Sequence, residues 1–255
     1  MTQPPEVDFG RAAADYARHR QGFPPVFFAR IAAWGIGQPG QRVLDLGTGT
    51  GLLARALAER GCLATGLDPS PDLLAQARAA APDLTWLAGR AEATGLPGGA
   101  FDVVTAATCW HWFDRPAAAA EAMRLLAPGG RLLICSLDWH RVPGGVVDAT
   151  MAVIRRFSPL PEGAPQGGGV FQYPAWAREL LPAGFSAWES FALTLPLSYT
   201  PAAWRGRVQA SAHVVAMDAA TRTAYDAVLA DVLSSQFPGS AVVVEHHLFA
   251  LVAWA

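Results

Sequence analysis

The chain has 255 residues, of which 52% are hydrophobic and 16% charged, and its formal net charge is −2. This length suits one large α/β domain, and the apolar share favours a compact fold with a large core. The charge is close to zero and no basic run occurs, so the composition argues against a nucleic-acid-binding surface.

The sequence shows no targeting or membrane-spanning pattern. No apolar run approaches the roughly 20 residues that cross a bilayer, and the N-terminus lacks the charged and apolar regions of a signal peptide. We therefore expect a cytoplasmic protein with no membrane partner.

The N-terminal segment predicts two short helices within residues 9–35. Tyr16 and Arg20 share one face of the first helix, because they are four residues apart. The prolines at 24–25 break that helix and begin the second, which should end near Gly35.

The middle of the chain alternates short apolar strands with helices, a pattern typical of βαβ units and a parallel, mostly buried sheet. The predicted strands are Arg42–Leu46, Leu63–Leu67, Leu84–Leu87, Phe101–Ala106 and Gly130–Leu137. The predicted helices between them are Leu52–Arg60, Pro71–Ala80 and Pro116–Leu126.

After Leu137 the alternation becomes irregular. We expect helices at Val146–Phe157 and Tyr173–Leu181, strands at Ser186–Leu195 and His247–Trp254, and two more helices within 201–235. No linker separates domains. The sequence therefore predicts one domain, with 1–40 as an N-terminal helical cap, 41–137 as the binding core, 138–172 and 196–240 as lid insertions, and 173–195 and 241–255 as remaining core elements.

The first predicted strand runs directly into a glycine-rich turn, Gly47-Thr-Gly49-Thr-Gly51, and then into a helix. Such a turn lets the backbone approach a ligand closely at the carboxyl edge of the sheet. The dinucleotide fingerprint fits poorly, because Leu52 stands where its third glycine would fall. Asp45 would repel a pyrophosphate, whereas it suits a cationic ligand or fixes the loop through backbone N–H groups.

Val43–Gly51 resembles the first motif of the class I S-adenosylmethionine-dependent methyltransferases. Four further stretches resemble that family's motifs in the same order, and the group most similar is the ubiquinone-biosynthesis-like and trans-aconitate-methyltransferase-like one. The stretches are Leu67–Ser70, Gly89–Pro97, Phe101–Asp114 and Leu126–Leu133. The resemblance implies a doubly wound α/β, seven-stranded, mostly parallel Rossmann-like sheet.

The resemblance also implies roles for individual residues. Tyr16 and Arg20 would cap the cofactor, with Arg20 pairing with the methionine carboxylate. Asp68 would accept hydrogen bonds from the ribose hydroxyls. Many relatives carry Asp where this chain has Arg90, so the adenine contact falls to Glu92 and the backbone of Ala91. The full set expected to bind S-adenosylmethionine is Tyr16, Arg20, Asp45, Gly47, Thr48, Gly49, Gly51, Leu52, Asp68, Pro69, Ser70, Ala91, Glu92, Ala107, Thr108 and Trp112.

Two histidines are candidates for contact with the methyl acceptor. His111 follows the fourth strand, where it would either act as a general base or line the site. His140 follows the fifth strand at the same edge of the sheet. Trp110 and Trp112 would attract the sulfonium through cation–π contacts or simply pack. We expect no metal site, because no third ligand accompanies His246 and His247.

These patterns predict methyl transfer to a small-molecule acceptor, with S-adenosylhomocysteine as the product, by a monomer or homodimer that binds no nucleic acid. Methyl transfer mainly requires that the protein align the nucleophile and exclude water. Three alternatives stay open: a nicotinamide-dependent oxidoreductase, a macromolecule-directed methyltransferase and a binding module with a degenerate site.

Overall fold

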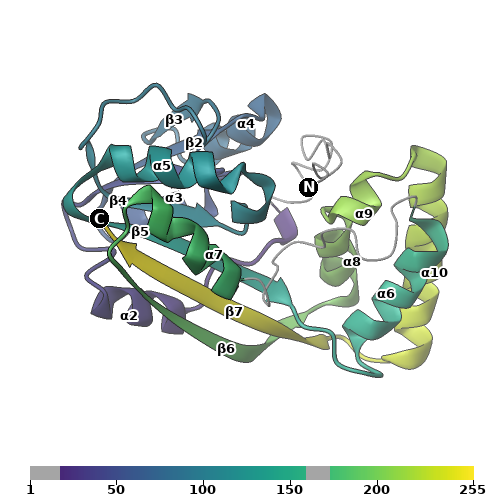
Figure 1. Cartoon of the computed structure of the whole chain (residues 1–255). Helices are drawn as coiled ribbons and strands as arrows, with labels where there is room; N and C mark the ends of the chain where they lie inside the picture. Colours follow the sequence, from purple (N-terminus) through teal and green to yellow (C-terminus); the bar gives the residue numbers. More distant parts are fainter. Residues whose placement is uncertain (1–17, 159–172) are drawn as a thin grey trace. The chain divides into compact units, whose positions relative to one another are not determined.

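The structure, a computed structural model, describes residues 18–158 and 173–255 (Figure 1). The chain divides into two compact units. The described residues of the first unit are 18–21, 138–158 and 193–247, and those of the second are 22–137, 173–192 and 248–255. The single-domain organisation predicted from the sequence stays a prediction.

The strands form one seven-stranded sheet in the order β3-β2-β1-β4-β5-β7-β6. Pairs β1–β2, β1–β4, β2–β3 and β4–β5 are parallel, as the alternation of strands and helices predicts. The strands are β1 (Arg42–Leu46), β2 (Leu63–Asp68), β3 (Thr85–Ala88), β4 (Phe101–Ala107), β5 (Leu126–Trp139), β6 (Ala187–Tyr199) and β7 (Val242–Trp254).

The α-helices of the second unit agree with the predicted positions to within two residues, whereas the short helices η2 (Trp110–Trp112) and η3 (Leu181–Ala183) were not predicted. Proline at the start of several α-helices fits the first helical turn. The α-helices are α2 (Pro25–Ala33), α3 (Leu52–Ala58), α4 (Pro71–Ala80), α5 (Arg115–Leu125) and α7 (Tyr173–Leu180).

Helices cover both faces of the sheet in the second unit. Leu46 and Leu67 pack in one cluster with residues of α5 and α7. Ala64 packs in another cluster with residues of α3 and α4. Successive side chains of a strand point to opposite faces, so Ala64 and Leu67, three residues apart on β2, face opposite sides. The fold is therefore doubly wound, as predicted.

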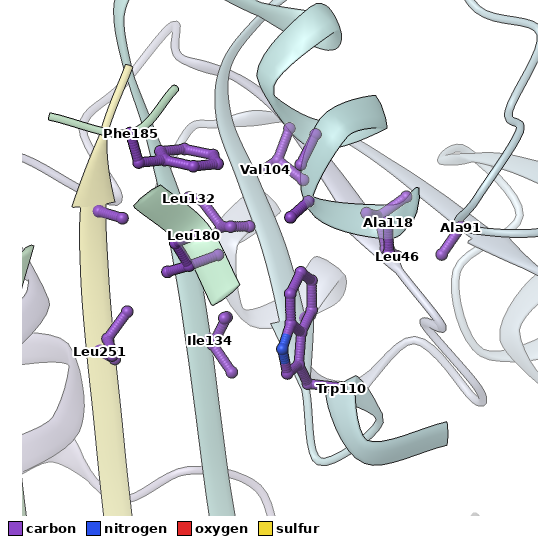
Figure 2. Packing of buried hydrophobic residues seen from close by; sticks show 14 of the residues in the cluster. Leu46, Ala91, Val104, Trp110, Ala118, Leu132, Ile134, Leu180, Phe185 and Leu251 are labelled. Carbon is purple, nitrogen blue, oxygen red and sulfur yellow. The ribbon is translucent and has the colours of Figure 1, made fainter. Parts of the chain in front are cut away.

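The larger core of the second unit lies between the sheet and helices α5 and α7 (Figure 2). Strands β1, β4, β5 and β7 each place alternate apolar residues on this face. The members labelled in Figure 2 are Leu46, Ala91, Val104, Trp110, Ala118, Leu132, Ile134, Leu180, Phe185 and Leu251.

The first unit has its own apolar core, built by α6 (Val146–Phe157), α8 (Pro201–Gln209), α10 (Ala219–Gln236) and nearby strand residues. The prediction of two helices within 201–235 is wrong, because the structure has three, the extra one being α9 (Ala212–Val215). Asp218 begins the last of them by accepting a hydrogen bond from the Thr221 N–H at 2.8 Å.

Three predicted strands differ from the structure in extent. β5 runs from Leu126 to Trp139 rather than from Gly130 to Leu137, and β6 runs from Ala187 to Tyr199 rather than from Ser186 to Leu195. β7 begins at Val242 rather than His247, because the polar residues at 245–247 interrupt its apolar pattern. The first predicted helix, with Tyr16, lies outside the described residues, apart from its end. Within the described ranges, none of the helices combines the length and apolar character needed to cross a membrane.

Candidate functional site

The glycine turn lies at the carboxyl ends of β1 and β2. Gly47, Gly49 and Gly51 have φ angles of 62°, 56° and 78°, in the left-handed region that favours glycine. The Thr48 N–H donates to the Leu67 carbonyl at 3.0 Å, which holds the turn against the end of β2. The turn therefore leads into α3 at the sheet edge where open α/β folds bind ligands.

Asp45 stabilises the turn from below. Its side chain is buried, and it accepts hydrogen bonds from the Thr48 and Thr105 hydroxyls, each at 2.6 Å. Of the two roles that the sequence left open, the structure thus favours fixing the loop, through threonine hydroxyls. Burial raises the pKa of Asp45 to about 6, although both hydrogen bonds oppose the shift and the charge of Asp68 adds to it.

Asp68 ends β2 beside the same turn. One carboxylate oxygen accepts the Gly49 N–H and the other accepts the Ser70 N–H, both at 2.8 Å. Burial raises the pKa of Asp68, while the two backbone hydrogen bonds lower it. Each oxygen keeps acceptor capacity, because a carboxylate has about four lone-pair sites. Ser70 also caps α4, since its hydroxyl accepts the Leu73 N–H at 3.4 Å. Pro69, which lies between Asp68 and Ser70 in the sequence, is exposed.

The end of β4 lies beside the glycine turn, on the side of β1 away from β2. Ala107 is followed by Thr108, whose φ of 59° is the only positive value of a non-glycine residue in the described chain. The next residue, Cys109, lies so near Gly47 that an added Cβ there would come within 2.9 Å of its Sγ. A glycine is therefore required at position 47 by space as well as by φ.

The short helix η2 places its aromatic residues differently from one another. Trp110 is 1% exposed and packs edge-on against Phe113, with ring centroids 5.8 Å apart. It belongs to the hydrophobic core (Figure 2), so of the two roles considered for it the structure favours packing. His111 and Trp112 are half-buried, and their ring centroids are 4.9 Å apart.

The loop after β3 is held by Glu92. Its Oε1 accepts the Asp114 N–H at 3.0 Å, and its Oε2 lies 3.4 Å from the Arg90 guanidinium. Ala91, the neighbouring residue, is buried. Glu92 therefore joins the predicted adenine-contacting loop to the start of α5, a role that the sequence did not reveal.

The structure brings together within the second unit the predicted residues on β1, β2, β4 and the loops that follow them. Tyr16 lies outside the described residues. Arg20 and His140 belong to the first unit, where Arg20 lies 3.9 Å from Asp138 and the His140 N–H donates to the Glu245 carbonyl. Thr105 was not among the predicted site residues, although it lies in register opposite Asp45 on the neighbouring strand.

The residues of this edge fit an adenosyl group. A Cβ added at Gly49 would meet no atom within 4 Å, so the backbone there faces open space. The Asp68 carboxylate beside it can accept further hydrogen bonds, as two ribose hydroxyls require. A buried acid and an open glycine backbone are the features that a nucleoside needs at this position.

Comparison with known proteins agrees with this fold and site. Residues 44–134 match the family described as "Methyltransferase domain". An uncharacterized methyltransferase of Mycobacterium tuberculosis is 37% identical over 162 residues, which are 61% of this chain and 65% of the relative. The chain thus matches just under two thirds of that relative's length. Demethylmenaquinone methyltransferase of Thermus thermophilus is 38% identical over 56% of this chain and 68% of its own length.

Solved structures show the same fold. A putative type II methyltransferase from Anaeromyxobacter dehalogenans superposes with a TM-score of 0.63, at 22% identity, over 92% of this chain and 97% of its own. The doubly wound sheet with an acid-supported glycine turn defines a nucleoside-binding α/β protein. The sequence relatives make the assignment more specific: the chain belongs to the class I S-adenosylmethionine-dependent methyltransferases.

Proposed function

We propose that this protein transfers the methyl group of S-adenosylmethionine to a small-molecule acceptor, with S-adenosylhomocysteine as the product. The observation that carries the proposal is the position of Asp68 beside the open backbone of Gly49. Family membership supports the same cofactor. The alternative of a nicotinamide cofactor is disfavoured by Leu52, which replaces the third glycine of the dinucleotide fingerprint.

The residues of the chain bind and orient. Asp68 accepts hydrogen bonds from the ribose, the loop at Ala91 and Glu92 borders the adenine, and the turn from Gly47 to Gly51 lies against the nucleoside. The bound cofactor supplies an activated methyl group, so the protein has to align the acceptor and exclude water. His111 and Trp112 line the methyl-transfer position after β4. The roles predicted for Tyr16, Arg20 and His140 stay predictions.

A small acceptor is supported by the names of relatives. One is demethylmenaquinone methyltransferase and another is malonyl-[acyl-carrier protein] O-methyltransferase of Serratia marcescens, 38% identical over 42% of this chain and 43% of its own length. The sequence also lacks a basic run, which disfavours RNA or DNA as the acceptor.

The proposal is tested by calorimetry and a transfer assay on the full chain. S-adenosylhomocysteine should bind, NAD should not, and labelled methyl groups from S-adenosylmethionine should appear on a small acceptor from a screened collection. Binding of NAD in place of S-adenosylhomocysteine would instead support the oxidoreductase alternative. Transfer only to RNA or protein, with binding that weakens steeply as salt rises, would support a macromolecule-directed enzyme.

A further inference from the structure

A cluster of buried polar side chains lies inside the first unit, beside its apolar core. Asp138 is 9% exposed, Arg207 5%, Tyr199 4% and His246 1%. Asp138 Oδ1 lies 3.7 Å from the Arg207 guanidinium and 3.9 Å from that of Arg20. Burying charged groups is costly even when they are paired, and apolar residues of similar size often serve stability as well or better. Such a cluster therefore points to function.

One hydrogen-bond acceptor of the cluster has no donor in the described part of the chain. The second oxygen of Asp138, Oδ2, is buried and has no hydrogen-bond partner among the described residues. Buried carboxylate oxygens are almost always satisfied, because an unpaired one loses its hydration without compensation. In an ion-pair network that served only stability, this oxygen would also accept a hydrogen bond. The orphaned oxygen thus indicates a place for a group that donates a hydrogen bond.

The neighbouring Tyr199 hydroxyl is oriented by His246. The Nδ1 of His246 lies 2.9 Å from the Val244 carbonyl, which only accepts, so Nδ1 carries the proton. Burial lowers the pKa of His246 to about 4, so at neutral pH its Nε2 bears a lone pair. The Tyr199 hydroxyl, 3.1 Å away, therefore donates to Nε2 and presents its own oxygen as an acceptor.

Aromatic rings adjoin these acceptors. Trp139 lies under the Arg207 guanidinium at 4.8 Å, and its ring centroid is 5.2 Å from that of Trp204. Trp204 packs edge-on against Tyr199 at 5.5 Å. The cluster is not sealed, since the side chains of Asp138 and Arg20 are each 12% exposed and Trp139 is half-buried. A ligand suited to it combines an apolar or aromatic body with a hydrogen-bond donor.

We infer that Asp138, Tyr199 and Trp139 form a binding site for a partly apolar small molecule that presents an O–H or N–H group to Asp138 Oδ2. A carboxylate presented to these two positions is disfavoured, because both of them, Asp138 Oδ2 and the Tyr199 hydroxyl oxygen, are acceptors.

Three probes on one ring system test the inference: phenol, aniline and benzoate. In ligand-observed NMR titrations the full chain should bind phenol and aniline at least about tenfold more tightly than benzoate. The Asp138→Asn variant should reduce this preference to about threefold or less, because one carboxylate acceptor becomes a donor. Asp226→Asn, which removes the carboxylate partner of Arg205 in the same unit, is the matched control and should keep the preference.

A measurement on the wild-type chain keeps the inference testable even if the Asp138→Asn variant does not fold. Phenol should shift the indole N–H signals of Trp139 and Trp204. Equal or tighter binding of benzoate, no binding of any probe, or an unchanged preference in Asp138→Asn overturns the inference.

Calorimetry with S-adenosylhomocysteine separates this inference from the proposed function. Its affinity should stay within about twofold in Asp138→Asn, and a larger loss would assign Asp138 to the cofactor and overturn the inference. Absence of S-adenosylhomocysteine binding in the wild type, together with the expected probe preference, would overturn the proposed function and leave the binding site standing.

Discussion

The indole ring of Trp86 occupies the space that a side chain at Gly51 would need. The same ring, on β3, also lies against Gly66 of β2, so it packs beneath both the end of the glycine turn and the adjoining strand. Its Nε1–H donates to the Ala81 carbonyl at 2.8 Å, which limits how far the ring can move. Trp86 is therefore the support on which the turn rests.

Three glycine-to-alanine substitutions distinguish the cost of steric crowding from the cost of backbone strain in the free energy of unfolding. Gly66→Ala brings a Cβ against Trp86 without a positive φ and should cost about 1–3 kcal/mol. Gly49→Ala meets no atom within 4 Å but has a φ of 56°, so it should cost about 1–2 kcal/mol. Gly51→Ala combines both penalties and should cost the most. Urea unfolding measures the three values.

A background with Trp86→Leu supplies the control. Gly66→Ala should cost less there than in the wild type, because the two closest atoms it collides with belong to Trp86 and only Thr48 Cγ2, at 2.8 Å, remains. An undiminished cost would show that Trp86 does not set the space at Gly66.

Replacing Asp68 should weaken cofactor binding. Asp68→Ala removes both the acceptors for ribose hydroxyls and the bond that holds Gly49, so we expect a loss of about 2–4 kcal/mol in the binding of S-adenosylhomocysteine by calorimetry. Asp102→Ala is the matched control. It breaks an exposed ion pair with Arg42 at the amino ends of β1 and β4. Unchanged affinity in Asp68→Ala would refute the ribose assignment.

The stability of the fold should depend on the protonation of Asp45. Its pKa is raised from 3.8 to about 6, so the folded state binds a proton that the unfolded chain releases. The contribution of Asp45 to stability is therefore full below pH 4 and is lost as pH rises from about 4 to about 6, by up to about 3 kcal/mol. Thermal melts across this range, compared between wild type and Asp45→Asn, measure it. A difference between the two that does not change with pH would contradict the shift.

Thr108 holds a backbone conformation that a β-branched residue rarely adopts. Thr108→Gly should relieve this strain and raise the free energy of unfolding by about 0.5–1 kcal/mol, after the entropy cost of glycine. Thr85→Gly, at an ordinary position on β3, should destabilise instead. Denaturant unfolding checks both, and a destabilised Thr108→Gly would show that the turn after β4 does not carry strain.

His111 should act by lining the site. We expect His111→Gln to lower kcat less than about tenfold, whereas loss of a general base costs about 10²–10⁴-fold. The pH profile of kcat should also keep its shape in this variant. A larger loss, with the limb of the profile near neutral pH removed, would instead identify His111 as the base.

The sequence by itself determined the sheet, most element boundaries and the residues of the glycine turn. Apolar periodicity and glycine or proline positions are local signals, and β1, α4 and α6 match the predicted bounds to the residue. The family was predicted from five motifs in order along the chain, of which the glycine turn within Val43–Gly51 is the first.

Only the tertiary structure decided how the remaining side chains are used. Thr105 satisfies Asp45 from 60 positions away, and Trp86 lies under Gly51 from another strand. Trp110 and Trp112 share one short helix, yet only Trp110 is buried in the core. Asp138, Tyr199 and His246 are far apart in sequence and close in the first unit. Register and packing join residues across long separations, and a periodic pattern along one chain carries no record of those partners.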